Sequence, residues 1–402
     1  MPQWSEYSNG QRIKLLRGKE ITQAALAEMT GLSLPTVRAA EQDKTLTLTT
    51  LVKIATALGT DSSTILGQTE PRSGASVSER TMLRRLSHAV HDTATGDVPD
   101  ETEPAQLAEL HALVDHAWDL YGESEYTELG ATLPGLLATA YATHATANLT
   151  AREGAAGALS DVFQVCAYMS NQLQARDLAY AAAAHARTHA KNAGEPLRIG
   201  RVEACRSWIF RRDHRVAESL ELVERAAEDL RPSYATASVE HLTVYGNLVN
   251  HCAVAASRIE GQKARTKDYL SQAHSVGARL GAEHRLHGGA FGPATAAVKA
   301  VDINLHIGDV GKALDLIATM PKLSGLSVAV QNRYALDTAL AQAQAGQWDN
   351  SLDTLEEVCT KAPHWARHQS VPGLIVQSIG ARSTARLRHV AALLGVQAVP
   401  SQ

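Results

Sequence analysis

Residues 22–41 read TQAALAEMTGLSLPTVRAAE, and this segment decides the fold of the N-terminal region. Thr22 can cap a helix, because its hydroxyl accepts a hydrogen bond from an otherwise unpaired backbone N–H. Gly31 can end that helix, since glycine adopts a left-handed backbone at little cost. Ser33 can cap a second helix, and Pro35 falls in its first turn, where a missing N–H does little harm. The segment therefore predicts two short helices joined by a tight turn.

Flanking residues extend this pattern into a small helical domain. Apolar residues continue at helical spacing on both sides, at Ile13, Leu15, Leu16, Leu48, Leu51, Ile54, Ala55 and Leu58, and Gly59 follows. The residues in register with a known motif are Gln23, Leu26, Ala27, Gly31, Ser33, Val37 and Glu41. Residues 9–67 thereby resemble the XRE/Cro/phage-repressor class of helix-turn-helix DNA-binding domains. Asp43 departs from that class, which usually has glycine there, so at this turn an aspartate would have to adopt the left-handed backbone conformation. Leu46 stands where proline is common.

The resemblance implies that the start of the second helix enters the major groove of DNA. The residues expected to face the bases are Leu34, Thr36, Arg38 and Ala39, with Arg38 the best candidate for a bidentate contact to guanine. Phosphate contacts are expected from Thr22, Gln23 and Lys44, and Ser33 joins this DNA-binding set as the cap of the reading helix. The alternative for Arg38 is a pairing with nearby acids on a solvated face. Glu41 is interpreted as structural, tying its helix to the next one.

Length and charge suggest how such a reader is used. The chain has 402 residues, which predicts two to three domains. It carries 38 Lys and Arg against 42 Asp and Glu, and residues 1–66 hold 7 basic against 6 acidic residues. A weakly basic monomer binds DNA poorly, so we expect a homodimer on a palindromic operator in double-stranded DNA.

The cysteines and the N-terminus favour a cytoplasmic protein. Four scattered cysteines, without a Cys-x-x-Cys pair, predict small apolar fillers in a reduced compartment rather than disulfides or metal ligands. Residues 1–6 are polar and no apolar core follows, so no secretory signal is expected. No apolar run approaches membrane-spanning length.

The rest of the chain is rich in Ala and Leu and predicts an all-α fold. Breakers at 67–76 indicate a linker, which gives a DNA-binding domain over 1–67, a linker over 68–77 and a helical repeat domain over 78–402. Strand signals are almost absent, and the Gly-rich segment 288–293 is expected to be a loop between helices.

The predicted helices come in pairs. Turns followed by a second helix are expected at 175–178, 212–215, 261–264, 308–313 and 346–351. Gly308 and Gly346 lie 38 residues apart, close to the tetratricopeptide period of about 34. Ala313 falls where its helix touches the preceding one, and Pro321 and Pro363 end their units. A single pair cannot bury its apolar face, so a stacked, tetratricopeptide-like α-solenoid is predicted.

This region also resembles two groups of regulators. Residues 291–298, 308–309 and 330–337 are similar to a large group of actinobacterial XRE-type regulators with helical-repeat C-terminal domains. The overall plan is similar to the Gram-positive quorum-sensing regulators, which join such a reader to a peptide-binding tetratricopeptide array. The resemblance implies a dimeric transcription regulator that senses a signalling peptide or a small molecule.

In a curved array, the first helix of each pair lines the side on which an extended ligand would lie. Polar and aromatic residues predicted there are Tyr168, Asn171, Gln172, Arg206, Trp208, Tyr245, Asn247, Asn250, Asn304, Asn332, Arg333 and Tyr334. Asn suits a peptide backbone because it offers both a donor and an acceptor. The alternative is ordinary hydrogen bonding between repeats.

Enzymatic and cofactor functions find little support in the sequence. His185 with His189, and His364 with His368, have i,i+4 spacing, but no Glu separates either pair as a metalloprotease requires and no third ligand can be placed. Nucleophile-elbow, P-loop and dinucleotide-binding motifs are absent from the sequence. We therefore expect no metal, no cofactor and no catalysis. Two alternatives to ligand sensing stay open: a repeat domain that docks a partner protein, and a helical hydrolase with an incidental reader domain.

Overall fold

The structure is a computed structural model that describes residues 4–18, 21–58, 60–67, 77–99, 101–362, 365–366, 369–379 and 385–394. Gly59, residues 68–76 of the predicted linker, Pro363, His364 and His368 lie outside the described residues. The chain divides into two compact units, one comprising 1–75 and 332–402 and the other 76–331. The predicted domain boundaries stay a prediction. No described helix is both long and apolar enough to cross a membrane.

The first unit begins with the short helices that the sequence predicts. They are a 3-10 turn (Trp4–Glu6), α1 (Asn9–Arg17), α2 (Gln23–Thr30), α3 (Leu34–Glu41), α4 (Leu48–Ala57) and α5 (Ser62–Ile65). The apolar positions of the predicted pattern meet in one core, where Ile13, Leu26, Val37, Leu51 and Ile54 are fully buried. This burial is the main stabilising contribution of such a small domain. The remaining described helices of the unit are α18 (Trp348–Lys361), α20 (Ser370–Ile379) and α21 (Ala385–Leu394), and the division between units falls within α17 (Val328–Gln344).

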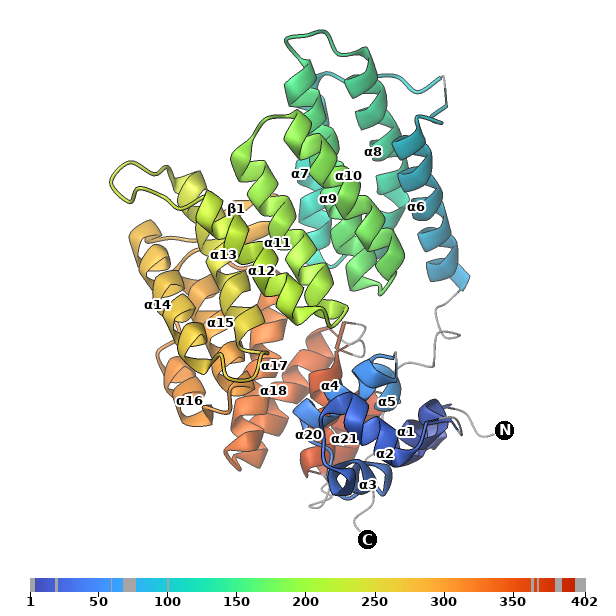
Figure 1. Cartoon of the computed structure of the whole chain (residues 1–402), viewed down its shortest axis with the longest axis vertical. Helices are drawn as coiled ribbons and strands as arrows, with labels where there is room; N and C mark the ends of the chain where they lie inside the picture. Colours follow the sequence, from blue (N-terminus) through green and yellow to red (C-terminus); the bar gives the residue numbers. More distant parts are fainter. Residues whose placement is uncertain are drawn as a thin grey trace. The chain divides into compact units, whose positions relative to one another are not determined.

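The second unit is a series of helices that pack in sequential pairs (Figure 1). In chain order they are α6 (Val77–Thr95), α7 (Leu107–Glu123), α8 (Tyr126–Thr146), α9 (Arg152–Gln172), α10 (Arg176–Asn192), α11 (Pro196–Arg212), α12 (Val216–Asp229), α13 (Val239–Ala256), α14 (Lys263–Leu280), α15 (Pro293–His306) and α16 (Val310–Ala318). All five predicted turns fall between the members of a pair. The predicted all-α fold, with a small N-terminal reader followed by many paired helices, is confirmed.

The turns within the pairs share one backbone geometry. The residue two positions before the second helix is left-handed in six pairs, with φ between 61° and 79°: Ser124, Gln174, His214, Gly261, Gly308 and Gly346. In five of these turns, all except that at Gly261, the next residue donates its N–H to the carbonyl five positions back. That bond closes a Schellman-type C-cap, which satisfies a carbonyl at the helix end. One local motif therefore joins the two helices of successive pairs.

The second helices approach the first ones at a repeated small residue. The fourth residue of α10, α12, α14, α16 and α18 is Ala179, Ser219, Thr266, Ala313 and Ser351, and each is fully buried. Where this residue is serine, its hydroxyl donates to a carbonyl of the first helix, as from Ser219 to Ser207 at 2.9 Å and from Ser351 to Ala339 at 2.7 Å. Ala313 is fully buried, at the position where the sequence predicts that its helix touches the preceding one.

One prediction about this region is wrong. The segment between α14 and α15 is not a plain loop, because β1 (His284–Leu286) and β2 (Gly289–Phe291) pair antiparallel, with His284 opposite Phe291. His287 and Gly288 form the tip, and Gly288 has a left-handed φ of 72°. Each strand is only three residues long, too short for an alternating pattern to be recognised in the sequence. The hairpin is anchored where Phe291, fully buried, packs against Tyr245 and Val249 of α13.

Candidate nucleic-acid interface and ligand site

Both helices of the predicted reader motif begin at the predicted caps. The Thr22 hydroxyl accepts a hydrogen bond from the Ala25 N–H at 3.1 Å, and Ser33 accepts one from the Thr36 N–H at 3.2 Å. Gly31 is left-handed with φ 61°, and Pro35 occupies the first turn of α3. These local interactions set the angle between α2 and α3.

The departure at Asp43 is accommodated by its own side chain. Asp43 is left-handed with φ 57°, as expected of a residue that replaces glycine. Its carboxylate accepts hydrogen bonds from the Gly10 N–H at 2.7 Å and from the Ser8 hydroxyl at 2.5 Å. These bonds tie the end of α3 to the start of α1. They also offset the cost of a left-handed non-glycine residue, which is about 1–2 kcal/mol.

Glu41 is structural, as predicted, but its partners precede it in the chain. Its carboxylate accepts hydrogen bonds from Arg17 Nε of α1 and from the Gln23 side-chain amide of α2, each at 2.6 Å. The Glu41 side chain is only 4% exposed. The expected tie to the following helix is therefore wrong, and Glu41 instead ties its own helix, α3, to the two helices before it, α1 and α2. The Gln23 amide, a predicted phosphate contact, faces Glu41.

The outer face of α3 carries the residues expected to read DNA. Arg38 is exposed, and Leu34, Thr36 and Ala39 are half-buried beside it. Thr22 and Lys44 are also exposed, which leaves them free to approach a phosphate backbone. The Thr36 hydroxyl lies 2.7 Å from the Ser33 hydroxyl and so extends the cap. The arrangement presents one long cation, Arg38, from a rigid helix, which suits insertion into a major groove.

A family comparison identifies this region. Residues 13–69 match the model of the Cro/C1-type HTH DNA-binding domain. The chain carries a Cro/C1-type helix-turn-helix domain at its N-terminus. A DNA-binding domain of this type points to transcription regulation and is typical of regulators that are not enzymes. No curated protein and no solved structure matches the chain. The paired helices that follow the helix-turn-helix domain are not identified as tetratricopeptide repeats.

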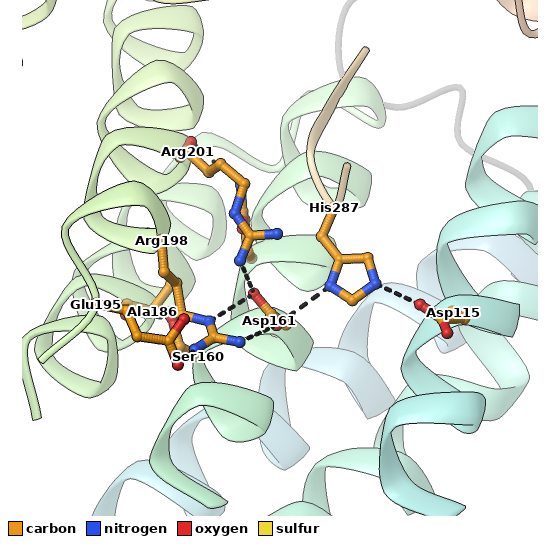
Figure 2. A network of polar contacts seen from close by, with 9 residues as sticks. Asp115, Ser160, Asp161, Ala186, Glu195, Arg198, Arg201 and His287 are labelled. Atoms are coloured by element: carbon orange, nitrogen blue, oxygen red, sulfur yellow. Dashed lines mark hydrogen bonds and ion pairs between the residues drawn. The ribbon is translucent and has the colours of Figure 1, made fainter. Parts of the chain in front are cut away.

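A second candidate site lies in the second unit, around a buried carboxylate. Asp161 of α9 is 1% exposed, and Arg198 and Arg201 of α11 approach it from one side. Arg198 Nη2 lies 3.0 Å from Asp161 Oδ2, and Arg201 Nη2 lies 3.2 Å from Oδ1. From the other side, the hairpin tip inserts His287, whose ring stands between Asp161 and Asp115 of α7 (Figure 2). His287 Nε2 lies 2.5 Å from Asp115 Oδ1.

The ionisation of this cluster follows from its surroundings. Burial would raise the pKa of Asp161, but the hydrogen bond from His287 and the charges of Arg201 and Arg198 outweigh it and hold the pKa well below its usual value. Burial would lower the pKa of His287, but hydrogen bonding to Asp161 and Asp115 outweighs burial and raises it. The geometry therefore favours a charged pair that clamps the hairpin tip onto α9 and α7.

Four half-buried aromatic side chains form a cluster, and two of them, Trp118 and Tyr168, contact the hairpin tip. We call this cluster the aromatic wall: Trp118 and Tyr121 of α7, Tyr168 of α9 and Trp208 of α11. The Tyr168 ring centroid lies 5.2 Å from Trp118, 5.5 Å from Tyr121 and 5.2 Å from Trp208. The Tyr168 hydroxyl donates to the Gly288 carbonyl, and His287 stacks on Trp118 at 6.2 Å. Aromatic residues form only 4% of the chain, so this gathering is a marked concentration.

Next to the aromatic wall stands a cationic side chain with an unsatisfied donor. Arg211, near the end of α11, has a buried Nη1 without a hydrogen-bond partner. Its pKa falls to about 9 because it is buried and because Arg258 repels it, although Asp302 and Tyr168 act in the opposite direction. His251 of α13 lies within range of Arg211, and its pKa is held well below its usual value by burial first and then by Arg211 and Lys299.

The structure brings only some of the predicted ligand residues together. Tyr168 and Trp208 are in contact, and Gln172 accepts from Arg212 at 3.4 Å. Asn171, Asn250 and Asn304 are buried on first helices, with exposed fractions of 1%, 2% and 5%. Asn247 lies against the hairpin at Gly289, and Tyr245 packs in the core beside Phe291. Arg206 pairs with Glu203 at 2.6 Å. Asn332, Arg333 and Tyr334 belong to the other compact unit.

The sequence analysis missed the charged members of this site. Asp161, Arg198, Arg201, Arg211 and His287 were not singled out, because each alone is an ordinary charged residue. A usable signal was the concentration of five arginines over residues 196–212, which ends in the adjacent pair at 211–212.

The histidine pair that was considered for a metal packs around a ring instead. His189 stacks on Phe163 at 5.7 Å, and His185 lies 5.2 Å from the same ring. Burial, with His144 and His185 nearby, lowers the pKa of His189 to about 4. Within the described residues, no three His, Cys, Asp or Glu side chains are grouped to hold a metal. The four cysteines are buried and free, as expected of apolar fillers, and burial raises the pKa of Cys359 to about 11.

Proposed function

We propose that this protein is a ligand-responsive transcription regulator that binds a palindromic operator as a homodimer. The observation that carries the proposal is the exposed side chain of Arg38 on α3. The two capped helices α2 and α3 fix its position, and they lie within the region that matches the Cro/C1-type domain. An exposed arginine at this position can make a bidentate contact to guanine.

The dimer follows from electrostatics. With 7 basic against 6 acidic residues over 1–66, one reader attracts phosphates weakly. Two readers joined in one molecule bind two half-sites, and the second contact gains from a high effective concentration. The half-sites must then lie about one helical turn, roughly 34–36 Å, apart.

The sensing role belongs to the paired helices, which we assign to a tetratricopeptide-like solenoid that also holds the dimer. Support comes from the repeated turn geometry and from the polar and aromatic residues on first helices in the second unit. A signalling peptide or small molecule that binds one arrangement of the array more tightly would shift the distance between readers and thus operator affinity.

The test begins with a selection of operators from a random DNA library, since it requires no prior target. Fluorescence anisotropy then measures binding of the selected DNA by wild-type protein and by Arg38→Ala, with Arg225→Gln on the exposed face of α12 as a matched control. We expect tight, concentration-dependent binding to a palindrome, lost in Arg38→Ala and kept in the control. Selection of no sequence at all would contradict the proposal.

The same assay separates ligand sensing from the alternatives. A small-molecule fraction of spent culture medium that changes operator affinity would support a diffusible ligand. An operator affinity that no culture fraction changes, but that a co-purified protein does change, would favour an array that docks a partner protein. Turnover of a substrate retained by Arg38→Ala would indicate the hydrolase alternative.

A further inference from the structure

Helices α7, α9, α11 and α13 of the second unit carry buried polar side-chain atoms that have no hydrogen-bond partner among the described residues. Among them are the Trp118 Nε1, the Asn171 Nδ2, the Arg211 Nη1, the His251 Nδ1 and both side-chain amide atoms of Asn250. Asn171 and Asn250 are 1% and 2% exposed, so these atoms lie deep in the unit. Leaving a buried donor without an acceptor costs about 1–3 kcal/mol, and more for a charged group. Five helical positions with this defect point to a bound molecule that supplies the missing partners.

The charged residues around Arg211 indicate whether the bound molecule is an anion or a cation. The cations Arg258 and Arg212 repel the charge of Arg211 and lower its pKa, whereas Asp302 acts in the opposite direction. His251 beside it is in range of Arg211 and Lys299 and stays neutral, because burial and these charges lower its pKa. A neutral imidazole can donate to an anion without adding charge. The surroundings of Arg211 thus favour an anionic group and disfavour a cation.

The aromatic wall indicates what the uncharged part of the bound molecule is like. Arg211 lies three residues after Trp208 on α11, so the two side chains share one face of that helix. The Trp208 ring contacts Tyr168, which touches the two other members of the wall. The adjacent Arg212 places its guanidinium 5.7 Å from the centroid of Trp208. Half-buried rings beside a few fixed polar groups are typical of sites for small organic ligands, where the rings contact the apolar body and the polar groups set its orientation.

We propose that this site binds an organic anion, with a carboxylate or phosphate group at Arg211 and an apolar body against the aromatic wall. The proposal rests on the ligand-sensing function and names the chemical class of the ligand. Arg211 makes the charge-assisted hydrogen bond, and Asn171, Asn250 and His251 supply neutral donors around it. The free carboxylate of a short peptide and a small organic acid share this chemistry.

The test uses two dyes that differ only by an anionic group. The anion is 1-anilinonaphthalene-8-sulfonate, and its neutral counterpart is N-phenyl-1-naphthylamine. Fluorescence titrations are run on the full chain for wild type, Arg211→Gln, Arg211→Lys and the exposed control Arg225→Gln. Circular dichroism melting checks that each variant folds.

We expect saturable binding of the sulfonate dye and a loss of roughly ten- to hundredfold in Arg211→Gln, the range of a charge-assisted hydrogen bond. Arg211→Lys should keep part of this affinity, and Arg225→Gln all of it. Affinity for the neutral dye should be equal in all four proteins. Absence of saturable sulfonate binding by wild type, or equal weakening of both dyes in Arg211→Gln, would overturn the proposal.

Competition then distinguishes the two sources of the anion. Displacement of the dye by a free-acid aromatic tripeptide, but not by 3-phenylpropionate, would assign a peptide; displacement by 3-phenylpropionate would assign a small acid. Both results support the site, whereas equal displacement by the C-terminally amidated tripeptide would contradict it. Operator binding is measured separately. If a displacing anion leaves operator affinity unchanged, the proposed regulation fails while the site stands. If Arg211→Gln still responds to the active culture fraction, the site fails while the regulation stands.

Discussion

His287 Nδ1 lies 3.2 Å from Asp161 Oδ2, and this contact fastens the β1–β2 hairpin tip to α9. The hairpin follows α14, so the contact joins late and early helices of the same unit. Two further bonds, from His287 to Asp115 and from the Tyr168 hydroxyl to the Gly288 carbonyl, act at the same place. The hairpin tip therefore helps to hold the aromatic wall in position.

His287→Gln should destabilise the second unit most at low pH. The pKa of folded His287 is raised above 6.5 by Asp161 and Asp115, against burial and Arg201, so its charged form stabilises the fold. This contribution is fully present below about pH 6.5 and is lost as the pH rises through the folded pKa. Urea unfolding at pH 5.5 and 8.5 should show a loss of about 1.5–3 kcal/mol at the lower pH and a smaller one at the higher pH. An equal loss at both would exclude a protonated His287.

Gly288→Ala should cost more stability than Gly261→Ala. Both glycines are left-handed, with φ of 72° and 79°, so alanine strains each backbone by about 1–2 kcal/mol. At Gly288 the added Cβ would also overlap the side-chain amide of Gln164, which is fully buried and donates to the Arg201 carbonyl at 3.2 Å. Nothing lies within 4 Å of the corresponding atom at Gly261. Thermal unfolding of the two variants should differ by a further ~1–3 kcal/mol. Equal costs would mean that the hairpin tip is loosely packed.

Glu41→Ala should unfold the helix-turn-helix domain or weaken it by about 3–5 kcal/mol, because it leaves Arg17 without its buried partner. The Arg17 and Glu41 side chains are 12% and 4% exposed. Glu221→Ala is the matched control, since its pair with Arg225 is 68% exposed on both sides. Chemical denaturation followed by circular dichroism should show a change under about 1 kcal/mol for the control. Similar effects of the two substitutions would refute the structural role of Glu41.

Arg38→Ala and Lys44→Ala should weaken DNA binding in different ways. Loss of a base contact by Arg38 should cost about 1–3 kcal/mol on the selected operator and relax its sequence preference. Loss of Lys44 should weaken binding to all DNA sequences alike and reduce the slope of log affinity against log salt concentration by about 1. Anisotropy titrations at several salt concentrations distinguish the two. A sequence-independent loss in Arg38→Ala would place this residue on the phosphates.

Gln174→Gly should raise the stability of the second unit by roughly 0.5–1 kcal/mol. Gln174 has φ 62°, and glycine removes left-handed strain of about 1–2 kcal/mol while adding chain entropy worth about 0.5–1 kcal/mol. Gln347→Gly serves as the control, because Gln347 has φ −85° and gains nothing from glycine. Differential scanning calorimetry should show melting temperatures that move in opposite directions. A lower melting temperature for Gln174→Gly would show that its side chain matters more than its backbone.

Parts of the fold and of the site were predictable because they depend on neighbours in the chain. The caps at Thr22 and Ser33, the turn at Gly31 and all five turns between paired helices were found in this way. Gln174 and His214 adopt the left-handed conformation although neither is glycine, so the sequence did not predict their backbone conformation. The turns that contain them were predicted. The partners of Glu41 were misassigned because the packing of α1 against α3 determines them.

The sequence by itself determined the helices, their ends, their pairing and the reader motif, since capping, turn and periodicity signals act within a few residues. Only the tertiary structure decided which polar side chains meet. Asp161 joins Arg198, Arg201 and His287 because helices and a hairpin distant in sequence pack together, as in the bond between Tyr168 and Gly288, which are 120 residues apart. No local pattern encodes such a contact, because it depends on the summed packing of every helix between the two partners.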